Sequence, residues 1–346
     1  MAYGSIHQKQ AVNSDDQNNT TDDSELKPQL PVPVNPKDIS TEPTDSSTLP
    51  GNILIADRGN NRVIEVTPDK KIVWELHFND LFPGLPRGFG ADDAFFTPGG
   101  KTIIVNLEEA HVIAEIDYAT KKIVWQYGTL YKPGSAPGLL NTPDDAYRWP
   151  DGLTSVADIK NCRILFINPD KTIAKTYGQT RICKDAPGFY NKPNGDTPLP
   201  NGNTLVSIIN GHKVVEIRPD GTEVFRLNLP INYPSDAQKL PNGDILVASY
   251  TKQGQVIEIG LDGKVAWQYY FPHNPERGLS FPSLAIALQN GNILLNDDAN
   301  ARVIVIDKKT KNIIWQYGVT HKPGSAYGQL NTPDGVDVHY PNATVK

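Results

Sequence analysis

The apolar residues of this chain fall in short runs of four to six, rich in Ile and Val, and turn residues such as Pro-Asn-Gly or Asp-Gly bound each run. No segment of helical length carries apolar residues at a spacing of 3.6. Short apolar runs between turns are typical of β-strands. The pattern therefore predicts an all-β protein built of many short strands.

The strand pattern repeats along the chain. One unit of four short strands recurs at intervals of roughly 40–50 residues, the length of a four-stranded propeller blade. The six copies begin at or near Gly51, Gly100, Gly152, Asn201, Asn242 and Asn290. Six copies predict a six-bladed β-propeller of four-stranded antiparallel blades.

The two ends of the repeat region complement each other. The first copy begins at its second strand, Asn52–Asp57, and has no inner strand before it. A surplus inner strand, Pro333–Pro341, follows the last copy. We expect this strand to complete the first blade and close the ring, because closure removes free sheet edges.

One aromatic position recurs in the outer strand of the copies. Large flat side chains there suit packing between neighbouring blades, so we expect a structural role. The position is occupied by Trp74, Trp125, Lys175, Phe225, Trp267 and Trp315.

The segment before the first copy has a different composition. Residues 11–24 are almost wholly polar, and a Pro-rich stretch follows at residues 27–36. Such a segment buries too little apolar surface to offset its ordering entropy. We therefore expect a disordered tail or linker over residues 1–48 and the propeller over 49–346. We see no signal-peptide pattern at Met1, yet a polar tail of this kind favours an exported, extracytoplasmic protein.

Overall charge limits the choice of partner. The formal net charge is −6 and the isoelectric point is near 5.7, whereas a nucleic-acid surface needs a basic stripe. No apolar run reaches the roughly 18 residues of a membrane span. We expect a monomer that binds a small molecule or a protein, with no nucleic acid and no membrane span.

Acidic residues recur where ligands usually approach a propeller, on the face where inner strands start and second strands end. Asp93, Asp145, Asp196 and Asp236 share one column at the start of the inner strands. Converging carboxylates require a cation, raised pKa values or hydrogen bonds from neighbouring strands. Oxygen ligands suit Ca²⁺ or Mg²⁺, so these four residues are candidate metal ligands, and the alternative is a structural role.

The second strands end in a further set of acids, Asp57, Asp158 and Asp297. They are candidate ligand-binding residues on the same face. Arginines recur just after the following turns, at Arg62, Arg163 and Arg302. The alternative is that each arginine pairs with the preceding aspartate, which would make the acids structural.

The chain has two cysteines, Cys162 and Cys183. The repeat alignment places both on one face of one blade, so a disulfide is geometrically feasible. It would close a loop of about 20 residues and add about 3 kcal/mol of stability, in agreement with an oxidising compartment. The alternative is two free thiols, and the spacing matches no zinc pattern.

The repeat units, with strands such as RVIEV and IVWQYG, resemble those of NHL-type propellers and of the arylsulfotransferase-like propellers of bacteria. The resemblance covers roughly residues 49–340 and implies a propeller scaffold. The arylsulfotransferase family uses a histidine, and one of its signatures places it before the aspartate of an inner strand. The corresponding positions here hold no histidine: Asp92, Asp144, Gly195, Ser235, Ser283 and Asp334.

Two main functional hypotheses remain. The first is an exported propeller that binds a ligand or partner at the acidic channel mouth without catalysis. The second is a lactonase-like hydrolase or lyase that uses a divalent cation, with one ring aspartate as general base. An arylsulfotransferase-like enzyme is a third. We favour binding, because the sequence shows no pair of nucleophile and base.

Overall fold

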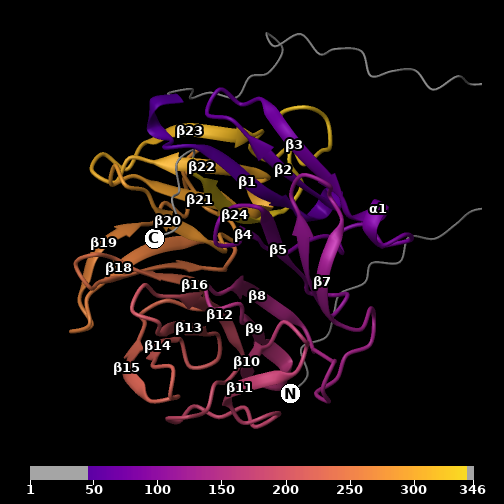
Figure 1. Cartoon of the computed structure of the whole chain (residues 1–346). Helices are drawn as coiled ribbons and strands as arrows, with labels where there is room; N and C mark the ends of the chain where they lie inside the picture. Colours follow the sequence, from indigo (N-terminus) through magenta and orange to yellow (C-terminus); the bar gives the residue numbers. More distant parts are fainter. Residues whose placement is uncertain (1–45, 341–346) are drawn as a thin grey trace, which may run out of the picture. The chain divides into compact units, whose positions relative to one another are not determined.

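The computed structural model describes residues 46–340, which form six four-stranded antiparallel sheets arranged as a six-bladed β-propeller (Figure 1). The fold prediction is confirmed. The expected tail lies outside the described residues except for Ser46–Thr48, which form a short 3-10 turn, η2. The carbonyl of Thr48 accepts a hydrogen bond of 2.8 Å from Asn290 Nδ2. The remainder of the tail assignment stays a prediction.

We number the blades I to VI along the chain and give their strands from the innermost outward. Blade I contains β24 (Pro333–His339), β1 (Asn52–Asp57), β2 (Arg62–Val66) and β3 (Ile72–His77). Blade II contains β4 (Ala94–Phe96), β5 (Thr102–Leu107), β6 (Val112–Asp117) and β7 (Ile123–Gly128). Blade III contains β8 (Pro143–Arg148), β9 (Thr154–Asp158), β10 (Arg163–Ile167) and β11 (Ile173–Gly178).

The second half repeats this order. Blade IV contains β12 (Pro193–Pro198), β13 (Thr204–Ile208), β14 (Lys213–Ile217) and β15 (Glu223–Asn228). Blade V contains β16 (Pro234–Lys239), β17 (Ile245–Ser249), β18 (Gln255–Ile259) and β19 (Val265–Tyr269). Blade VI contains β20 (Ala285–Ala287), β21 (Ile293–Asp297), β22 (Arg302–Ile306) and β23 (Ile313–Gly318). A single-turn helix, α1 (Phe78–Leu81), follows β3.

The ring closes through blade I. Strand β24 pairs antiparallel with β1, with Asn52 opposite His339 and Asp57 opposite Pro333. Strand β24 also contacts β4 of blade II and β21 of blade VI, so it joins both neighbouring blades. The prediction that the surplus strand completes the first blade is confirmed for Pro333–His339. Pro341, the last residue of the expected strand, lies outside the described residues.

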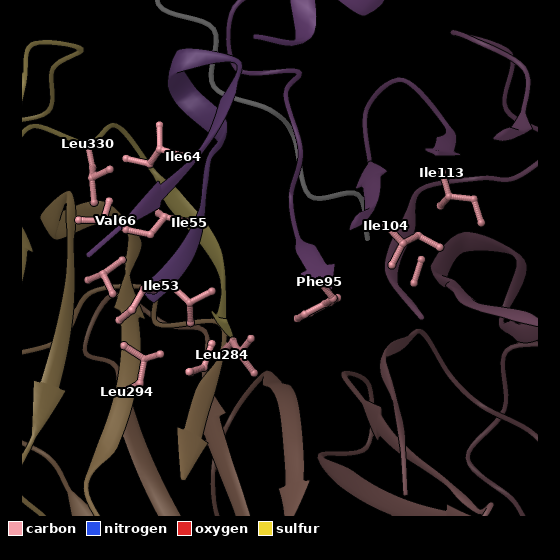
Figure 2. Close-up of a cluster of buried hydrophobic side chains, with 14 of the residues drawn as sticks. Ile53, Ile55, Ile64, Val66, Phe95, Ile104, Ile113, Leu284, Leu294 and Leu330 are labelled. Carbon is pink, nitrogen blue, oxygen red and sulfur yellow. The ribbon is translucent and has the colours of Figure 1, made fainter. Parts of the chain in front are cut away.

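The hydrophobic core lies between blades. Strands β1, β2, β9 and β10 are buried over nearly their whole length, because each blade packs between two others. This explains why β1 and β10 carry continuous apolar runs, over residues 53–56 and 164–167, that do not alternate. The outer strand β3 does alternate, because one of its faces meets solvent. Figure 2 shows one such cluster, with side chains from blade I beside those of blade VI: Ile53, Ile55, Ile64 and Val66 near Leu284 and Leu294.

The recurring tryptophans join neighbouring blades, as predicted. Each indole Nε1 donates a hydrogen bond of 2.8–3.0 Å to a carbonyl of the next blade, which satisfies the only polar atom of a buried ring. The pairs are Trp74 to Tyr118, Trp125 to Pro169, Trp267 to Lys308 and Trp315 to Pro68. Blade III has Lys175 at this position, and Tyr177 Oη instead donates to the carbonyl of Arg218 at 3.0 Å.

The turns after β1, β9 and β21 are alike and face the channel mouth. They form the 3-10 helices η3 (Arg58–Asn60), η4 (Ile159–Asn161) and η5 (Asp298–Asn300), each followed by a residue at φ 51–56°. The shared sequence is Asp-x-x-Asn-x-Arg. Its asparagine donates to a carbonyl of the connection that arrives from the preceding blade, through Asn60 to Gly324, Asn161 to Gly134 and Asn300 to Gly278. These turns therefore anchor the connections between blades.

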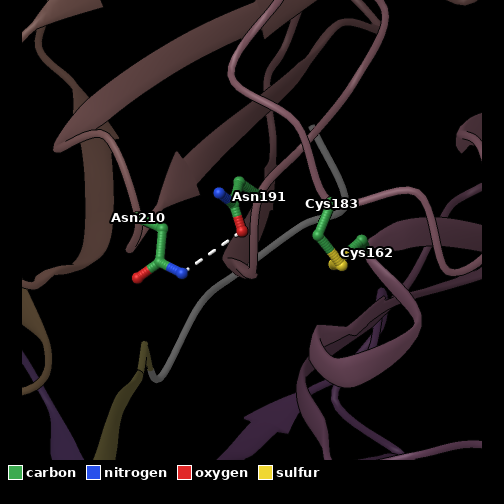
Figure 3. The surroundings of a disulfide bond; sticks show 4 residues. All are labelled: Cys162, Cys183, Asn191 and Asn210. Carbon is green, nitrogen blue, oxygen red and sulfur yellow. Dashed lines mark hydrogen bonds between the residues drawn. A yellow bond between two sulfur atoms is a disulfide. The ribbon is translucent and has the colours of Figure 1, made fainter. Parts of the chain in front are cut away.

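Cys162 and Cys183 form a disulfide, with Cα atoms 5.3 Å apart (Figure 3). Cys162 caps η4, and Cys183 lies in the connection from β11 to β12. The bond joins a turn of blade III to the connection that leaves the same blade. The prediction that the two residues lie close enough to pair is confirmed.

Within residues 46–340, none of the helices has the length and apolar character that a membrane crossing requires.

Candidate site at the mouth of the central channel

A cavity of about 50 Å³ opens where the inner strands begin. Six carboxyl groups and a single guanidinium line it, together with two tyrosines and smaller polar side chains. The carboxyl groups belong to Asp92, Asp93, Glu108, Asp144, Asp236 and Asp334, and the guanidinium to Arg58. If all were ionised, the cavity wall would carry a net charge of −5, because six negative charges would face one positive charge.

Three of the four predicted metal ligands meet at one point. Asp93, Asp145 and Asp236 come from blades II, III and V, and each offers an oxygen within 4.8 Å of the other two. We call these three residues the inner triad. Their exposed fractions are 4%, 0% and 2%. Within the part of the chain that the structure describes, Oδ1 of each of these carboxyl groups has no hydrogen-bond partner.

Asp196, the fourth predicted ligand, lies one register position further along its strand. Asp196 pairs with Val206, just as Ala146 pairs with Val156 and Ala237 with Val247. The expected column therefore holds Gly195, and the alignment that placed Asp196 beside the other three acids is wrong. The reason is that the aspartate of β12 stands three residues after the strand's first proline, whereas that of β8 or β16 stands two after it. Asp196 is fully buried but does not join the inner triad.

The acids that end the second strands belong to the scaffold. Oδ2 of Asp57, Asp158 and Asp297 accepts hydrogen bonds of 2.7–2.8 Å from Nε of the following arginine and of 2.8 Å from the intervening asparagine. Oδ1 accepts a backbone N–H at 2.7 Å from Asn331, Asn141 and Ser280 respectively. The expected pairing with Arg62, Arg163 and Arg302 is confirmed. None of the three acids lines the cavity.

The residue that directly follows the second strand of each blade occupies one repeated structural position, and most residues at this position were not predicted as site residues. This column of residues reads Arg58, Glu108, Ile159, Ile209, Tyr250 and Asp298 around the ring. A repeated structural position with six such different occupants is a signal of function, because repetition alone would give similar residues. The column has a charged side at blades I, II and VI and an apolar side at blades III and IV.

Arg58 is the centre of the charged side. Its guanidinium contacts Asp92, Asp334 at 2.5 Å, Glu108 at 3.0 Å and Glu109. Burial alone would raise the pKa of Asp334, but Arg58 lowers it below the usual range. Asp334 therefore stays ionised. We call Asp92, Glu108, Asp144 and Asp334 the rim acids.

The remaining carboxyl groups resist ionisation. Burial first, and the neighbouring carboxylates second, raise the pKa of Asp93 and Asp145 far above the ordinary value. The same causes raise the pKa of Asp144. Burial raises the pKa of Asp236 to about 6 and that of Glu108 to about 7. At neutral pH the empty cavity therefore holds protons that a bound cation would displace.

An aromatic wall borders the rim acids. Tyr233 and Tyr250 line the cavity with ring centroids 5.3 Å apart, and Phe281 packs against Tyr250 at 5.2 Å. Asp334, together with burial, raises the pKa of Tyr250, and burial raises that of Tyr233. Both phenols stay protonated and present a neutral ring beside carboxylates. No histidine lines the cavity within residues 46–340, so no imidazole is available there as a base.

Comparison with known proteins supports the architecture. Residues 175–337 match the family described as outer membrane protein assembly factor BamB. This segment is less than half of the chain. No curated protein matches the sequence.

Several solved structures share the fold. A protein of unknown function from Bacteroides caccae has a TM-score of 0.58 at 18% identity, covering 83% of this chain and 98% of its own. A chain of a nidogen/laminin complex has a TM-score of 0.55 at 14% identity, covering 82% and 97%. A catalytically inactive variant of virginiamycin B lyase from Staphylococcus aureus, solved with quinupristin, has a TM-score of 0.51 at 16% identity, covering 76% and 83%. These matches establish the class, a six-bladed β-propeller.

Proposed function

We propose that this propeller binds a small cationic ligand at the channel mouth and does not catalyse a reaction. The observation that carries the proposal is that four rim acids face the single guanidinium of Arg58 beside two neutral tyrosine rings, so that an entering cation can displace protons from the rim acids and bind the resulting carboxylates. Carboxylates attract a positive charge, and aromatic faces add about 0.5–2 kcal/mol for a cation. An organic ammonium group satisfies both surfaces at once.

The size of the cavity limits what enters it. About 50 Å³ holds a compact head group and not a whole drug-sized molecule, whose pockets are typically about 300–1,000 Å³. The rest of the ligand would lie outside, against the connections between blades. We expect a protein that acts as a monomer and recognises a small molecule through its charged end.

An extracytoplasmic location accompanies this proposal. A disulfide between Cys162 and Cys183 persists in oxidising compartments and is rare in the cytosol. The partial match to an outer membrane protein assembly factor agrees with this location.

The alternative is a hydrolase or lyase that uses a divalent cation at the channel. A fold shared with virginiamycin B lyase makes this class relevant. Catalysis needs a placed acid or base, and the cavity offers carboxyl groups whose pKa values are raised but no histidine. The third hypothesis, an arylsulfotransferase-like enzyme, lacks the histidine that the family uses.

Calorimetric titration with choline and with 3,3-dimethyl-1-butanol tests the proposal, because the two molecules have nearly the same shape and differ in charge. The titrations are run in EDTA so that no divalent cation competes. We expect choline to bind at least tenfold more tightly than the alcohol, and Tyr250→Leu to weaken choline roughly tenfold. Tyr270→Leu, at an exposed tyrosine outside the cavity, is the matched control. Equal affinity for both molecules would contradict a cation-selective mouth.

A further inference from the structure

The inner triad is a second feature of the channel, one residue further along the inner strands than the rim acids. Its three carboxylates come from β8, β16 and the residue before β4. All their closest oxygens lie within 4.8 Å of one another. Ca²⁺ binds oxygens at about 2.3–2.6 Å, so two ligands on opposite sides of one ion are about 4.6–5.2 Å apart. The triad oxygens therefore lie close enough together to bind one ion.

The unpaired oxygens of the triad are an independent observation. Asp145 is completely buried, and Asp93 and Asp236 are more than nine-tenths buried. No N–H of the described backbone donates to these carboxylates, and Tyr147 Oη reaches only Asp145 Oδ2, at 3.3 Å. Buried polar atoms almost always have partners, and leaving one without costs about 1–3 kcal/mol. Each of the three carboxyl groups therefore keeps a buried oxygen that no N–H or hydroxyl group of the described residues satisfies, and a bound cation would replace the protons that the neighbouring carboxyl groups share.

Gly195 of blade IV and Gly335 of blade I occupy the strand position that holds the triad aspartates in other blades. Because they have no side chain, they leave space beside the triad oxygens. A Cβ at Gly195 would lie 2.7 Å from Asp236 Oδ1 and 3.3 Å from Asp145 Oδ2. A Cβ at Gly335 would overlap Asp93 Oδ1. Neither glycine has a positive φ, so backbone conformation does not require it. At Gly195 the nearest obstacle to a side chain is the carboxyl group of Asp236, and at Gly335 the carboxyl group and the backbone of Asp93 both lie too close.

We propose that Asp93, Asp145 and Asp236 bind one divalent cation of the calcium type. Carboxylate ligands without nitrogen or sulfur favour a hard cation. Three monodentate carboxylates leave room for the waters that complete a coordination number of six to eight. The argument uses neither the tyrosines nor Arg58, but Asp93 and Asp236 also line the cavity, so the two cations would compete and each is titrated in the absence of the other.

The experiment uses the full chain after EDTA treatment and gel filtration. Thermal unfolding is followed with added CaCl₂ or MgCl₂, and bound metal is counted by elemental analysis after dialysis. We expect one Ca²⁺ per chain, a midpoint that rises with Ca²⁺ concentration, and a smaller rise with Mg²⁺. No bound metal and no shift at millimolar Ca²⁺ would overturn the proposal.

Variants assign the ion to the triad. Asp236→Asn should abolish the Ca²⁺-dependent shift, whereas Asp337→Asn should keep it. Asp337 is a matched control because it lies on inner strand β24, with a pKa that burial raises to about 6, outside the triad. Loss of binding in Asp144→Asn with retention in Asp236→Asn would move the ion to the neighbouring set of Asp92, Asp93 and Asp144 and overturn the assignment.

A second variant guards against a folding defect. Gly195→Ala changes no charge but places a methyl group against the triad oxygens, so it should weaken Ca²⁺ at least tenfold while the circular dichroism spectrum is unchanged. Unchanged affinity would contradict the role of the space at Gly195. Because Ca²⁺ is titrated without ammonium and choline is titrated in EDTA, failure of one proposal leaves the other standing.

Discussion

Two sets of buried aspartates in this propeller differ in what surrounds them. Asp57, Asp158 and Asp297 each accept hydrogen bonds from an arginine, an asparagine and a backbone N–H. Among residues 46–340, the inner triad has no cationic partner, and Oδ1 of each of its members has no hydrogen-bond partner. The same residue type, equally buried, is part of the scaffold in one place and a candidate binding group in the other. Burial alone therefore does not identify a site; unsatisfied oxygens do so only where the carboxyl groups also converge, as in the inner triad and not at Asp196.

The largest effect is expected from breaking a scaffold pair. Arg302→Ala would leave Asp297 as a buried carboxylate without its cation, and it would release the carbonyls of Glu276 and Gly278 that Arg302 also binds. We expect a loss of about 3–5 kcal/mol in the free energy of unfolding, measured by urea denaturation. A loss below about 1 kcal/mol would show that the turn does not depend on the ion pair.

The opposite sign is expected in the inner triad. In EDTA at pH 8, Asp145→Asn removes one of three repelling carboxyl groups and supplies an amide N–H to its neighbours. We expect the free energy of unfolding to rise by roughly 1–3 kcal/mol, since each pKa unit of differential interaction is worth about 1.4 kcal/mol. With saturating Ca²⁺ the wild-type chain should become the more stable one. A destabilised variant in EDTA would instead make Asp145 part of the scaffold.

The smallest effect concerns pH at the rim. Glu108 faces Arg58, Asp92, Asp334 and Glu109, and burial raises its pKa to about 7. Because protonation removes a negative charge, choline affinity should fall as the pH is lowered through 7, by roughly fivefold between pH 8.5 and 6.5. In Glu108→Gln this dependence should flatten, as measured by calorimetry. An equally steep dependence in the variant would assign the titration to another group.

The stability of the protein without ligand should change in the opposite direction and rise as the pH is lowered. The pKa of Glu108 is higher in the folded chain than in the unfolded chain, so its ionised form disfavours folding. Its unfavourable contribution is absent below about pH 4.5 and grows as the pH rises to about 7.

Much of the fold follows from the sequence, because each level of pattern agrees with the others. Apolar runs, turns, the tryptophan positions and the complementary ends all predict six blades. The scaffold acids were also foreseeable, since Asp57 and Arg62 stand five residues apart in a motif that recurs twice. The sequence does not reveal the register at the start of strand β12, where a β-bulge interrupts its pairing with β13. One extra residue between the first proline of β12 and Asp196 moves that acid away from the triad.

Arg58 and Glu108 escaped prediction for a different reason. Neither residue belongs to a recurring motif. The partners of each depend on which blades lie next to each other at the channel mouth, and this is not evident from a single repeat. Comparing the same turn position in all six blades would have found them, because that column is the least uniform one at the mouth.

The binding site can be completed only after strand β24 has closed the ring. Asn52 of β1 pairs with His339 of β24, which is nearly three hundred residues later in the chain. Contacts between residues so far apart in sequence form slowly. The same strand carries Asp334 to Arg58 and Gly335 to Asp93. A chain whose ring has not yet closed therefore lacks the rim acid Asp334 beside Arg58, so ligand binding at the rim would report that folding is finished.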